Sequence, residues 1–196
     1  MVASTERIKE LRETTGAGVL DCKKALDETG GNVEEAAKIL REKGLAKAAK
    51  KAERATAEGR VEAYIHPGAK LATLVEVDCE TDFVARTEQF QELAHNLAMH
   101  IAAAAPQWVS RQDIPESVIE AEKNLYRSEV ESEGKSERVA ERIIEGKLDK
   151  FYKENVLLEQ AYIRDESMTI QDVLNNAIAK MGENIVVRRF ARFQIG

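Results

Sequence analysis

Hydrophobic residues in the first part of the chain recur with the three-to-four-residue spacing of amphipathic helices. Three such sets follow one another, and each set ends at glycine, which readily adopts the backbone conformation that terminates a helix. The pattern predicts a compact bundle of three short helices over residues 1–44. The sets are Ile8 and Leu11, then Val19, Cys22, Ala25 and Leu26, then Val33, Ala36, Ala37 and Leu40, with ends near Gly16 and Gly18, at Gly30-Gly31 and at Gly44.

Residues 45–58 contain good helix formers but almost no large apolar side chain. They predict an exposed helical linker. Lys47, Lys50 and Lys51 make the segment basic, so a strip that binds phosphates is the alternative. Because no aromatic residues are interleaved with these lysines and the rest of the chain is acidic, a solvated linker is the preferred interpretation.

Residues 59–196 combine the strand and helix periods. Apolar and polar positions alternate on both sides of a turn at Pro67-Gly68, which predicts a β-hairpin. The helices and strands that follow indicate an α+β fold in which a small antiparallel sheet packs with helices. The predicted elements are strands over 61–65 and 71–79, helices over 87–105, 115–131 and 136–153, an irregular or partly extended segment over 156–163, a helix from Thr169 to Gly182, and a strand over 185–195.

The second hairpin strand gives way to a helix through a short connection that contains Thr81, Asp82, Phe83 and Val84. Such connections often present side chains to ligands or partners. In one interpretation Thr81 or Asp82 is an N-cap and Phe83 folds back into the core as a staple. In the other, Phe83 stays exposed and forgoes roughly 1.5–3 kcal/mol of burial, which makes sense only if a partner covers the ring. The pattern alone favours the first interpretation, and no local feature decides between the two.

Composition limits the class of protein. The chain has 196 residues, 43% of them hydrophobic, which suffices for one medium core and a small satellite domain. No apolar run approaches a membrane span, and the first residues lead straight into a helix without a secretory core region, so we expect a cytoplasmic protein. The net charge of −6 argues against a dedicated nucleic-acid binder. Cys22 and Cys79 are expected to be reduced core residues.

The sequence contains little evidence for a catalytic site or a cofactor site. Cys79, Asp82 and either His66 or His100 would be the parts of a thiol hydrolase, which predicts loss of activity in Cys79→Ser, but no local motif marks a nucleophile. The three histidines lack the spacing and the companion ligands of a zinc site. The glycines at 16–18 lack the Gly-Lys-Ser/Thr ending of a phosphate loop. We therefore expect a protein that is not an enzyme, holds no metal or cofactor, and does not bind nucleotide itself.

Five segments, spread over nearly the whole chain, closely resemble bacterial elongation factor Ts. They are residues 11–26 (LRETTGAGVLDCKKAL), 47–51 (KAAKK), 77–85 (VDCETDFVA), 99–102 (MHIA) and 185–190 (IVVRRF). The first and third are long and specific. The resemblance implies a guanine-nucleotide exchange factor for elongation factor Tu, the GTPase that carries aminoacyl-tRNA to the ribosome. It also implies a ubiquitin-associated-like domain over 1–44, the helical linker over 45–58 and a core and dimerisation domain over 59–196.

The resemblance assigns a role to the strand-to-helix connection. In the family, the loop that matches Thr81, Asp82, Phe83 and Val84 enters the GTPase domain beside its nucleotide site and dislocates magnesium. Phe83 would then be the apolar wedge and Asp82 the polar lever.

A second contact set is implied on the N-terminal bundle. The positions that match Arg12, Val19, Leu20 and Lys23 contact a helix of the same GTPase domain in the family. Periodicity alone instead favours core positions for Val19 or Leu20 and a solvated helix face for Arg12 and Lys23. Many relatives carry methionines where this chain has Val19-Leu20.

The chain has room for only one copy of the core subdomain, whereas long family members carry two. It therefore resembles the short form that works as a homodimer. The last strand is a plausible pairing edge, although Arg188, Arg189 and Arg192 could equally blunt it.

An alternative of a different class is a helical adaptor or RNA-associated translation protein that uses the basic linker. It predicts salt-sensitive binding that needs Lys47, Lys50 and Lys51.

Overall fold

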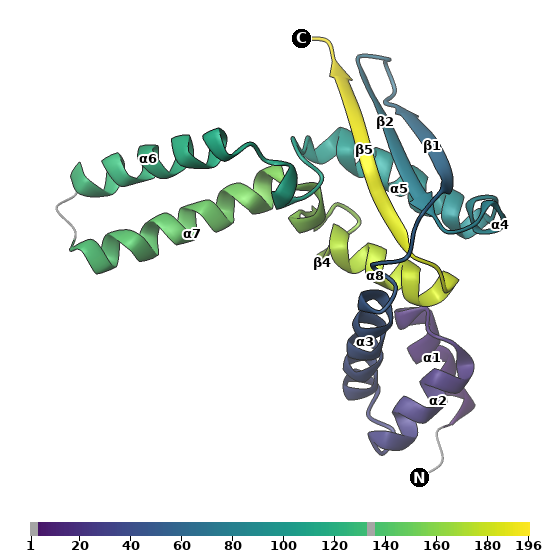
Figure 1. Ribbon diagram of the computed structural model, residues 1–196. Coiled ribbons are helices and arrows are strands. Elements are labelled where there is room, and N and C mark those ends of the chain that lie inside the picture. Colours follow the sequence, from purple (N-terminus) through teal and green to yellow (C-terminus); the bar gives the residue numbers. More distant parts are fainter. Residues whose placement is uncertain (1–3, 133–135) are drawn as a thin grey trace. The chain divides into compact units, whose positions relative to one another are not determined.

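A computed structural model describes residues 4–132 and 136–196 of the chain (Figure 1). The predicted α+β class with a small antiparallel sheet is confirmed: three strands form a sheet in the order β1-β2-β5, and β3 and β4 form a second, two-stranded sheet. The chain divides into two compact units made of separated segments. The first is Met1–Val61, Glu76–Ala94 and Asp172–Val187, and the second is Glu62–Val75, His95–Gln171 and Arg188–Gly196. The domain boundaries proposed from the sequence stay a prediction.

The first three helices are α1 (Thr5–Thr15), α2 (Val19–Glu28) and α3 (Val33–Ala49). Side-chain oxygens of Ser4 and Asn32 accept backbone N–H groups at the starts of α1 and α3, and Gly16 ends α1 in the left-handed conformation. The predicted apolar stripes meet in one buried cluster. Its members are Leu11, Cys22, Ala25, Leu26, Ala36 and Leu40.

The glycine pattern predicted that the third helix ends at Gly44. In the structure, this helix continues to Ala49. Gly44 is buried against α8 (Ile170–Met181), where an added Cβ would lie 3.6 Å from the Cβ of Ala179. Arg41 of α3 also forms an ion pair of 3.0 Å with Asp172 of α8. This glycine therefore marks a helix-to-helix contact. Of the predicted helical linker, only the part up to Ala49 is helical, and residues 50–57 form turns and irregular structure.

The central sheet consists of β1 (Glu58–Ile65), β2 (Leu71–Cys79) and β5 (Ile185–Gln194), and α5 (Glu88–Ala104) lies along it (Figure 1). Val75, Val77 and Cys79 of β2 are fully buried, as the alternation predicted. Thr73 of the same strand donates a hydrogen bond of 2.8 Å from Oγ1 to the carbonyl oxygen of Ala98 in α5. The helix thus covers the inner face of β2.

Apart from a one-turn helix that precedes α5, the remaining elements lie between α5 and β5 in the sequence. As predicted, two long helices, α6 (Glu116–Ser132) and α7 (Glu137–Asn155), follow one another and pack as a pair (Figure 1). Arg111 lies over the ring of Tyr152 near the base of this pair, 4.0 Å from the ring centroid. The pattern did not predict the strand at 165–169, because its residues do not alternate between apolar and polar. The short elements are α4 (Asp82–Ala85), η1 (Arg111–Asp113), η2 (Leu157–Glu159), β3 (Ala161–Tyr162) and β4 (Asp165–Thr169).

His100 is a fully buried polar residue of α5. Its Nε2 lies 3.0 Å from Oε1 of Gln160, while the amide nitrogen of Gln160 donates to the carbonyl oxygens of Ala104 and Glu154. Its Nδ1 lies 3.4 Å from the backbone nitrogen of Ile163. These contacts suit a neutral ring that donates from Nε2 and accepts at Nδ1. Burial lowers the pKa of His100 more than the bond to Gln160 raises it.

Two glycine substitutions should change stability in opposite directions. Gly44→Ala should raise the unfolding free energy by about 0.5–1 kcal/mol, because alanine favours a helix interior and its Cβ has room. Gly31→Ala should lower it by about 1 kcal/mol or more, because Gly31 has φ 91° and a Cβ there would meet the Arg7 guanidinium that binds its carbonyl. Denaturant unfolding of both variants tests this. A loss of stability in Gly44→Ala would contradict the packing of α3 on α8.

The buried His100 should make the protein less stable in acid. Below the usual histidine pKa near 6.5 the unfolded chain binds a proton that the folded protein excludes, so stability is full above that pH and falls as the pH decreases toward the lowered pKa of the folded state. The residue should contribute at most about 1.4 kcal/mol per pH unit. Denaturant unfolding between about pH 7.5 and 5 should therefore show a shallower fall for His100→Gln than for the wild type. Equal slopes would show that His100 does not carry this effect.

Candidate partner-binding site

Residues 81–84, here called the TDFV segment, form the start of a one-turn helix between β2 and α5. Thr81 is the N-cap of α4, with extended φ and ψ and its Oγ1 accepting the N–H of Val84 at 3.4 Å. The N-cap prediction is therefore confirmed for Thr81. Thr87 then marks the start of α5, where its Oγ1 accepts the N–H of Phe90.

Phe83 is 80% exposed, so the staple that folds this ring into the core is wrong. The geometry of one helical turn explains the exposure. Val84 and Ala85 are both buried, and successive helical side chains point roughly 100° apart, so the ring of Phe83 must lie nearly opposite the direction in which these two point. The buried pair anchors the segment and the phenylalanine projects from it.

Asp82 is also exposed, and its Oδ2 pairs with Nη2 of Arg86 at 2.8 Å, one turn further on. An exposed pair at this spacing contributes roughly 0–1 kcal/mol. A partner that offers Asp82 a better cation or an N–H donor can therefore separate it from Arg86 at small cost.

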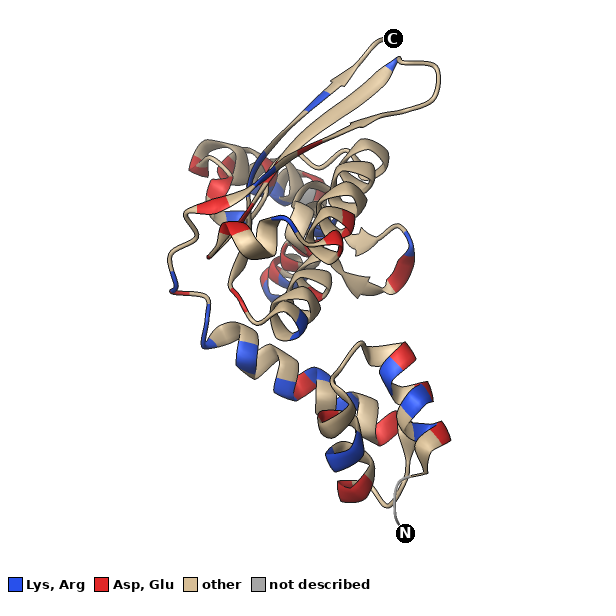
Figure 2. Cartoon of the chain, turned by 90° about the vertical axis from the view of Figure 1, so that its right-hand side faces the viewer, with Lys and Arg blue, Asp and Glu red and all other residues tan. Residues whose placement is uncertain are grey.

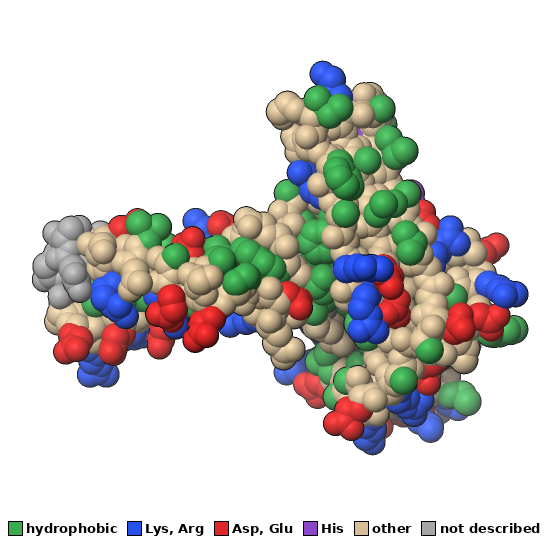
Figure 3. All heavy atoms as spheres, turned by 45° about the horizontal axis from the view of Figure 1, so that its top comes forward, with side chains coloured by type: hydrophobic (Ala, Val, Ile, Leu, Met, Phe, Trp, Pro, Cys, Tyr) green, Lys and Arg blue, Asp and Glu red, His purple; other side chains and the backbone are tan. Residues whose placement is uncertain are grey.

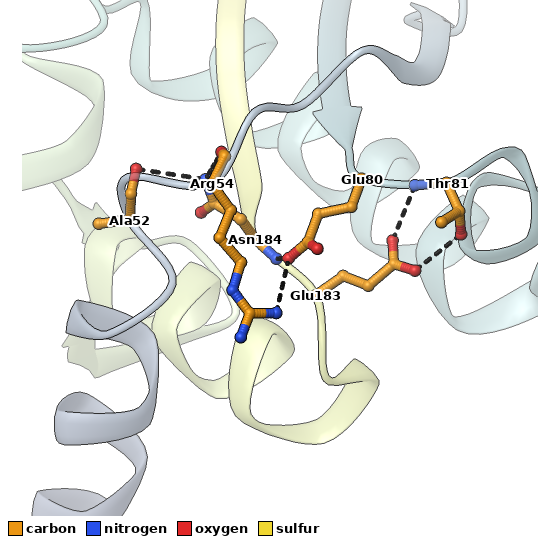
Figure 4. Close-up of polar contacts among 6 residues, drawn as sticks. All are labelled: Ala52, Arg54, Glu80, Thr81, Glu183 and Asn184. Carbon is orange, nitrogen blue, oxygen red and sulfur yellow. Dashed lines mark hydrogen bonds and ion pairs between the residues drawn. The ribbon is translucent and has the colours of Figure 1, made fainter.

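Glu183 binds Thr81 through both carboxylate oxygens (Figure 4). Oε1 accepts the hydroxyl of Thr81 at 2.7 Å and Oε2 accepts its backbone N–H at 3.0 Å. The neighbouring residue, Asn184, is buried and donates its backbone N–H to Glu80 at 2.7 Å. Its side-chain nitrogen donates to the carbonyl oxygen of Arg54 at 2.9 Å and to that of Ala52 at 3.4 Å.

The contacts of Cys79 argue against a thiol nucleophile. The sulfur is fully buried and donates to the carbonyl oxygen of Thr81. Burial raises the pKa of Cys79 to about 11, and the carboxylate of Glu183 adds to the rise. The thiol is thus protonated and inert at neutral pH. Both cysteines are free and buried, as predicted.

The four candidate residues of the bundle are all exposed. Val19 is 50% and Leu20 72% exposed, and Arg12 and Lys23 lie on the solvent side of α1 and α2. The alternative in which Val19 or Leu20 is a core residue is wrong, because Cys22, Ala25 and Leu26 supply the inward face of α2. The bundle and the TDFV segment belong to the same compact unit.

Carboxylates pair with some of the cations in and beside the basic segment that precedes β1. Figure 2 shows that positively and negatively charged residues are interspersed along the first three helices. Lys43 binds Glu28 at 3.0 Å and Lys47 binds Asp21 at 3.1 Å. Within the same part of the chain, Arg54 pairs with Glu80 at 3.5 Å. A continuous positive strip for phosphates is therefore not formed by these residues.

No cluster of three or more His, Cys, Asp or Glu side chains within 4–132 and 136–196 could hold a metal ion. In the same ranges, no helix has the length and the apolar character to cross a membrane.

The sequence profile of the family described as "Elongation factor TS" matches residues 3–196. The chain belongs to the elongation factor Ts family. Three bacterial relatives bear the same name, and the matches cover nearly all of each chain. The relative from Caldanaerobacter subterraneus is 58% identical over 98% of this chain and 96% of its own, that from Herpetosiphon aurantiacus 54% over 100% and 99%, and that from Thermosipho melanesiensis 54% over 98% and 98%. Family membership makes this protein a translation elongation factor.

In this member of the elongation factor Ts family, the sequence analysis did not identify the residues around Thr81 that come from the end of α8. Glu183 and Asn184 follow Gly182, which was predicted to end a helix, and their position beside a loop 102 residues earlier is a tertiary effect. A polar pair directly after a helix-ending glycine is a weak signal at best. The structure adds both residues to the site, together with Glu80.

Proposed function

We propose that this elongation factor Ts family member is a guanine-nucleotide exchange factor that binds elongation factor Tu in the cytoplasm and accelerates its release of GDP. One observation carries the proposal: Phe83 projects into solvent from a capped and anchored turn. A large exposed ring on a rigid base suits insertion into a partner, because the partner recovers the burial that the free protein forgoes.

In this proposal the TDFV segment enters the GTPase beside its magnesium and nucleotide. Phe83 is the wedge and Asp82 the polar lever, while Thr81 and the buried Val84 hold them in place. Magnesium bridges phosphate oxygens to protein ligands in a near-octahedral shell, so a small displacement of those ligands weakens the hold on GDP. The lever is available because Asp82 leaves Arg86 at little cost.

The exchange cycle then follows from linkage. If the factor lowers the affinity of the GTPase for GDP, GDP lowers the affinity for the factor by the same ratio, and GTP in excess completes the cycle. The second contact set, formed by Arg12, Val19, Leu20 and Lys23, supports binding without touching the nucleotide. This set combines two exposed apolar side chains with two exposed cations. Such a combination suits a partner helix whose surface is partly apolar and partly charged. No covalent step is needed, so the factor acts by protein binding and needs no cofactor.

The helical adaptor or RNA-associated protein is the weaker candidate. Its basic linker would have to release Lys47 from Asp21 before it could bind phosphates. It would still predict binding that weakens steeply with salt and depends on Lys47, Lys50 and Lys51.

We also propose that the factor works as a homodimer. Three large apolar side chains of the second unit are exposed on the three strands of the sheet: Ile65 at 66%, Leu74 at 45% and Phe193 at 66%. Their neighbours face α5: Glu62 contacts His95, Thr73 binds Ala98 and Arg192 binds Ala102. Because side chains alternate along a strand, the three apolar residues lie on the opposite face.

A second copy of the chain is a suitable cover for this face. Figure 3 shows hydrophobic side chains gathered over the strand ends. Exposed apolar patches of this kind mark interaction sites, and a symmetric dimer would bury the same patch of both chains. The outer face therefore supports dimerisation better than the edge of β5, where Arg192 is already bonded to Ala102.

Removing the wedge should slow exchange more than it weakens binding. With Phe83→Ala the maximal rate of GDP release from elongation factor Tu should fall about tenfold or more, because the ring acts on the distorted state. Leu20→Ala should instead raise the concentration that gives half of the maximal rate by up to about tenfold. Release of a fluorescent GDP analogue into excess unlabelled GDP measures both quantities.

Leu125→Ala is the matched control, because Leu125 is a comparably exposed apolar residue on α6. It should leave both quantities unchanged. If the wild-type protein does not accelerate GDP release, the proposed function is wrong. If Phe83→Ala accelerates GDP release as much as the wild type does, Phe83 is not the wedge.

A charge on the outer sheet face should separate the dimer. Leu74→Lys should give a monomer by sedimentation at concentrations where the wild type is a dimer, because two unpaired cations would face each other across a dry interface. Leu125→Lys places the same charge elsewhere and should remain dimeric. If the wild type is a monomer at protein concentrations of about tens of micromolar, which are comparable with the dissociation constants of weak dimers, the homodimer is excluded.

A further inference from the structure

We infer that Glu183 is a positioning residue for the TDFV segment, and that Asn184 joins this residue to the chain that follows α3. The inference rests on the proposed exchange function for its effect on GDP release. Its geometry stands on the contacts of Figure 4.

The first step concerns the hydroxyl of Thr81. It has one hydrogen, which goes to Oε1 of Glu183 at 2.7 Å, and this leaves a lone pair for the N–H of Val84. The second carboxylate oxygen accepts the backbone N–H of Thr81 at 3.0 Å. Glu183 thus sets both the rotamer of the cap and the direction of the peptide that leads into α4.

The second step concerns the length of α4. A helix of four residues has one turn and no stability of its own, so its conformation depends on its cap and on tertiary contacts. Val84 and Ala85 supply the tertiary contact by burial, and Thr81 supplies the cap. The direction of Phe83 is therefore fixed by the group that fixes Thr81.

The third step concerns what holds Glu183. It follows Gly182, whose φ of 81° ends α8 and whose N–H binds the carbonyl oxygen of Ile178 at 3.0 Å. It precedes Asn184, which is only 3% exposed and bonds Glu80, Arg54 and Ala52. Glu183 thus lies between the end of α8 and the buried residue Asn184, and both restrict the position of its backbone.

These contacts tie three distant segments together. The residues after α3, the end of β2 and the residues after α8 all meet at Asn184 and Glu183 (Figure 4).

A role limited to stability would look different. The bonds between Glu183 and Thr81 are exposed, and water replaces exposed bonds at small cost to the unfolding free energy. A positioning role predicts a normal melting temperature and a slower exchange step.

The test compares Glu183→Ala, Glu183→Gln and the control Glu166→Ala, an exposed carboxylate on β4. Glu183→Ala should lower the maximal rate of GDP release about tenfold, because a misdirected wedge loses most of its effect, and should change the half-maximal concentration less than about twofold. Glu183→Gln keeps one acceptor and should lie between the alanine variant and the wild type. Glu166→Ala should match the wild type.

The hydroxyl of Thr81 gives an independent check. Thr81→Val removes it and should lower the maximal rate about as much as Glu183→Ala does, whereas Thr81→Ser retains it and should lower the rate less. Wild-type maximal rates in Glu183→Ala, or a fall in rate that matches a fall in folded protein, would overturn the positioning role.

Amide hydrogen exchange separates this inference from the proposed function. The N–H groups of Thr81 and Val84 should exchange faster in Glu183→Ala than in the wild type, with or without the GTPase. If the wild type fails to accelerate GDP release, the exchange function is wrong, yet faster amide exchange would still establish that Glu183 holds the segment. Unchanged amide exchange would overturn the inference.

Discussion

The burial of Val84 and Ala85 is the constraint on which the rest of the candidate site depends. On a single helical turn, two consecutive inward side chains leave the preceding one no inward direction, so Phe83 is exposed as a consequence of its neighbours. The free protein forgoes roughly 1.5–3 kcal/mol of burial at this ring. Its exposure is thus a consequence of the geometry of the turn.

The contact of α3 with α8 shows that the helix which continues into the first part of the predicted linker is packed and is not a free tether. A free helical tether would let the bundle and the sheet approach a partner independently. Here α3 passes through Gly44 without a break, and both this glycine and Arg41 contact α8. The exposed Leu20 of the bundle and the exposed Phe83 therefore belong to one compact unit.

Periodicity predicted most helices and the hairpin because their signals are local and repeated. It failed at Gly44, since a glycine followed by good helix formers reads as a cap until its tertiary neighbour is known. It could not place Phe83, because a single residue on a one-turn helix has no period. Only the resemblance to a family singled out Leu20, which the structure then found exposed. Glu183 had no local signal, because its partner is Thr81, in a distant part of the chain.

Rigidity of the TDFV segment matters for what a wedge can do. Ordering a flexible loop costs about 1–2 kcal/mol per residue in backbone entropy, and a loop that ordered only on binding would lose that much of its contact energy. The caps at Thr81 and Thr87 and the carboxylate of Glu183 remove this cost in the free protein. Under the proposed exchange function, more of the contact energy would then be left to distort the nucleotide site. An interaction accelerates GDP release only if it is stronger in the distorted state of the GTPase than in the undistorted state. A segment that deforms more easily than the nucleotide site would therefore bind without promoting exchange. Under the proposed exchange function, the polar contacts around Thr81 would therefore bear on the rate of exchange.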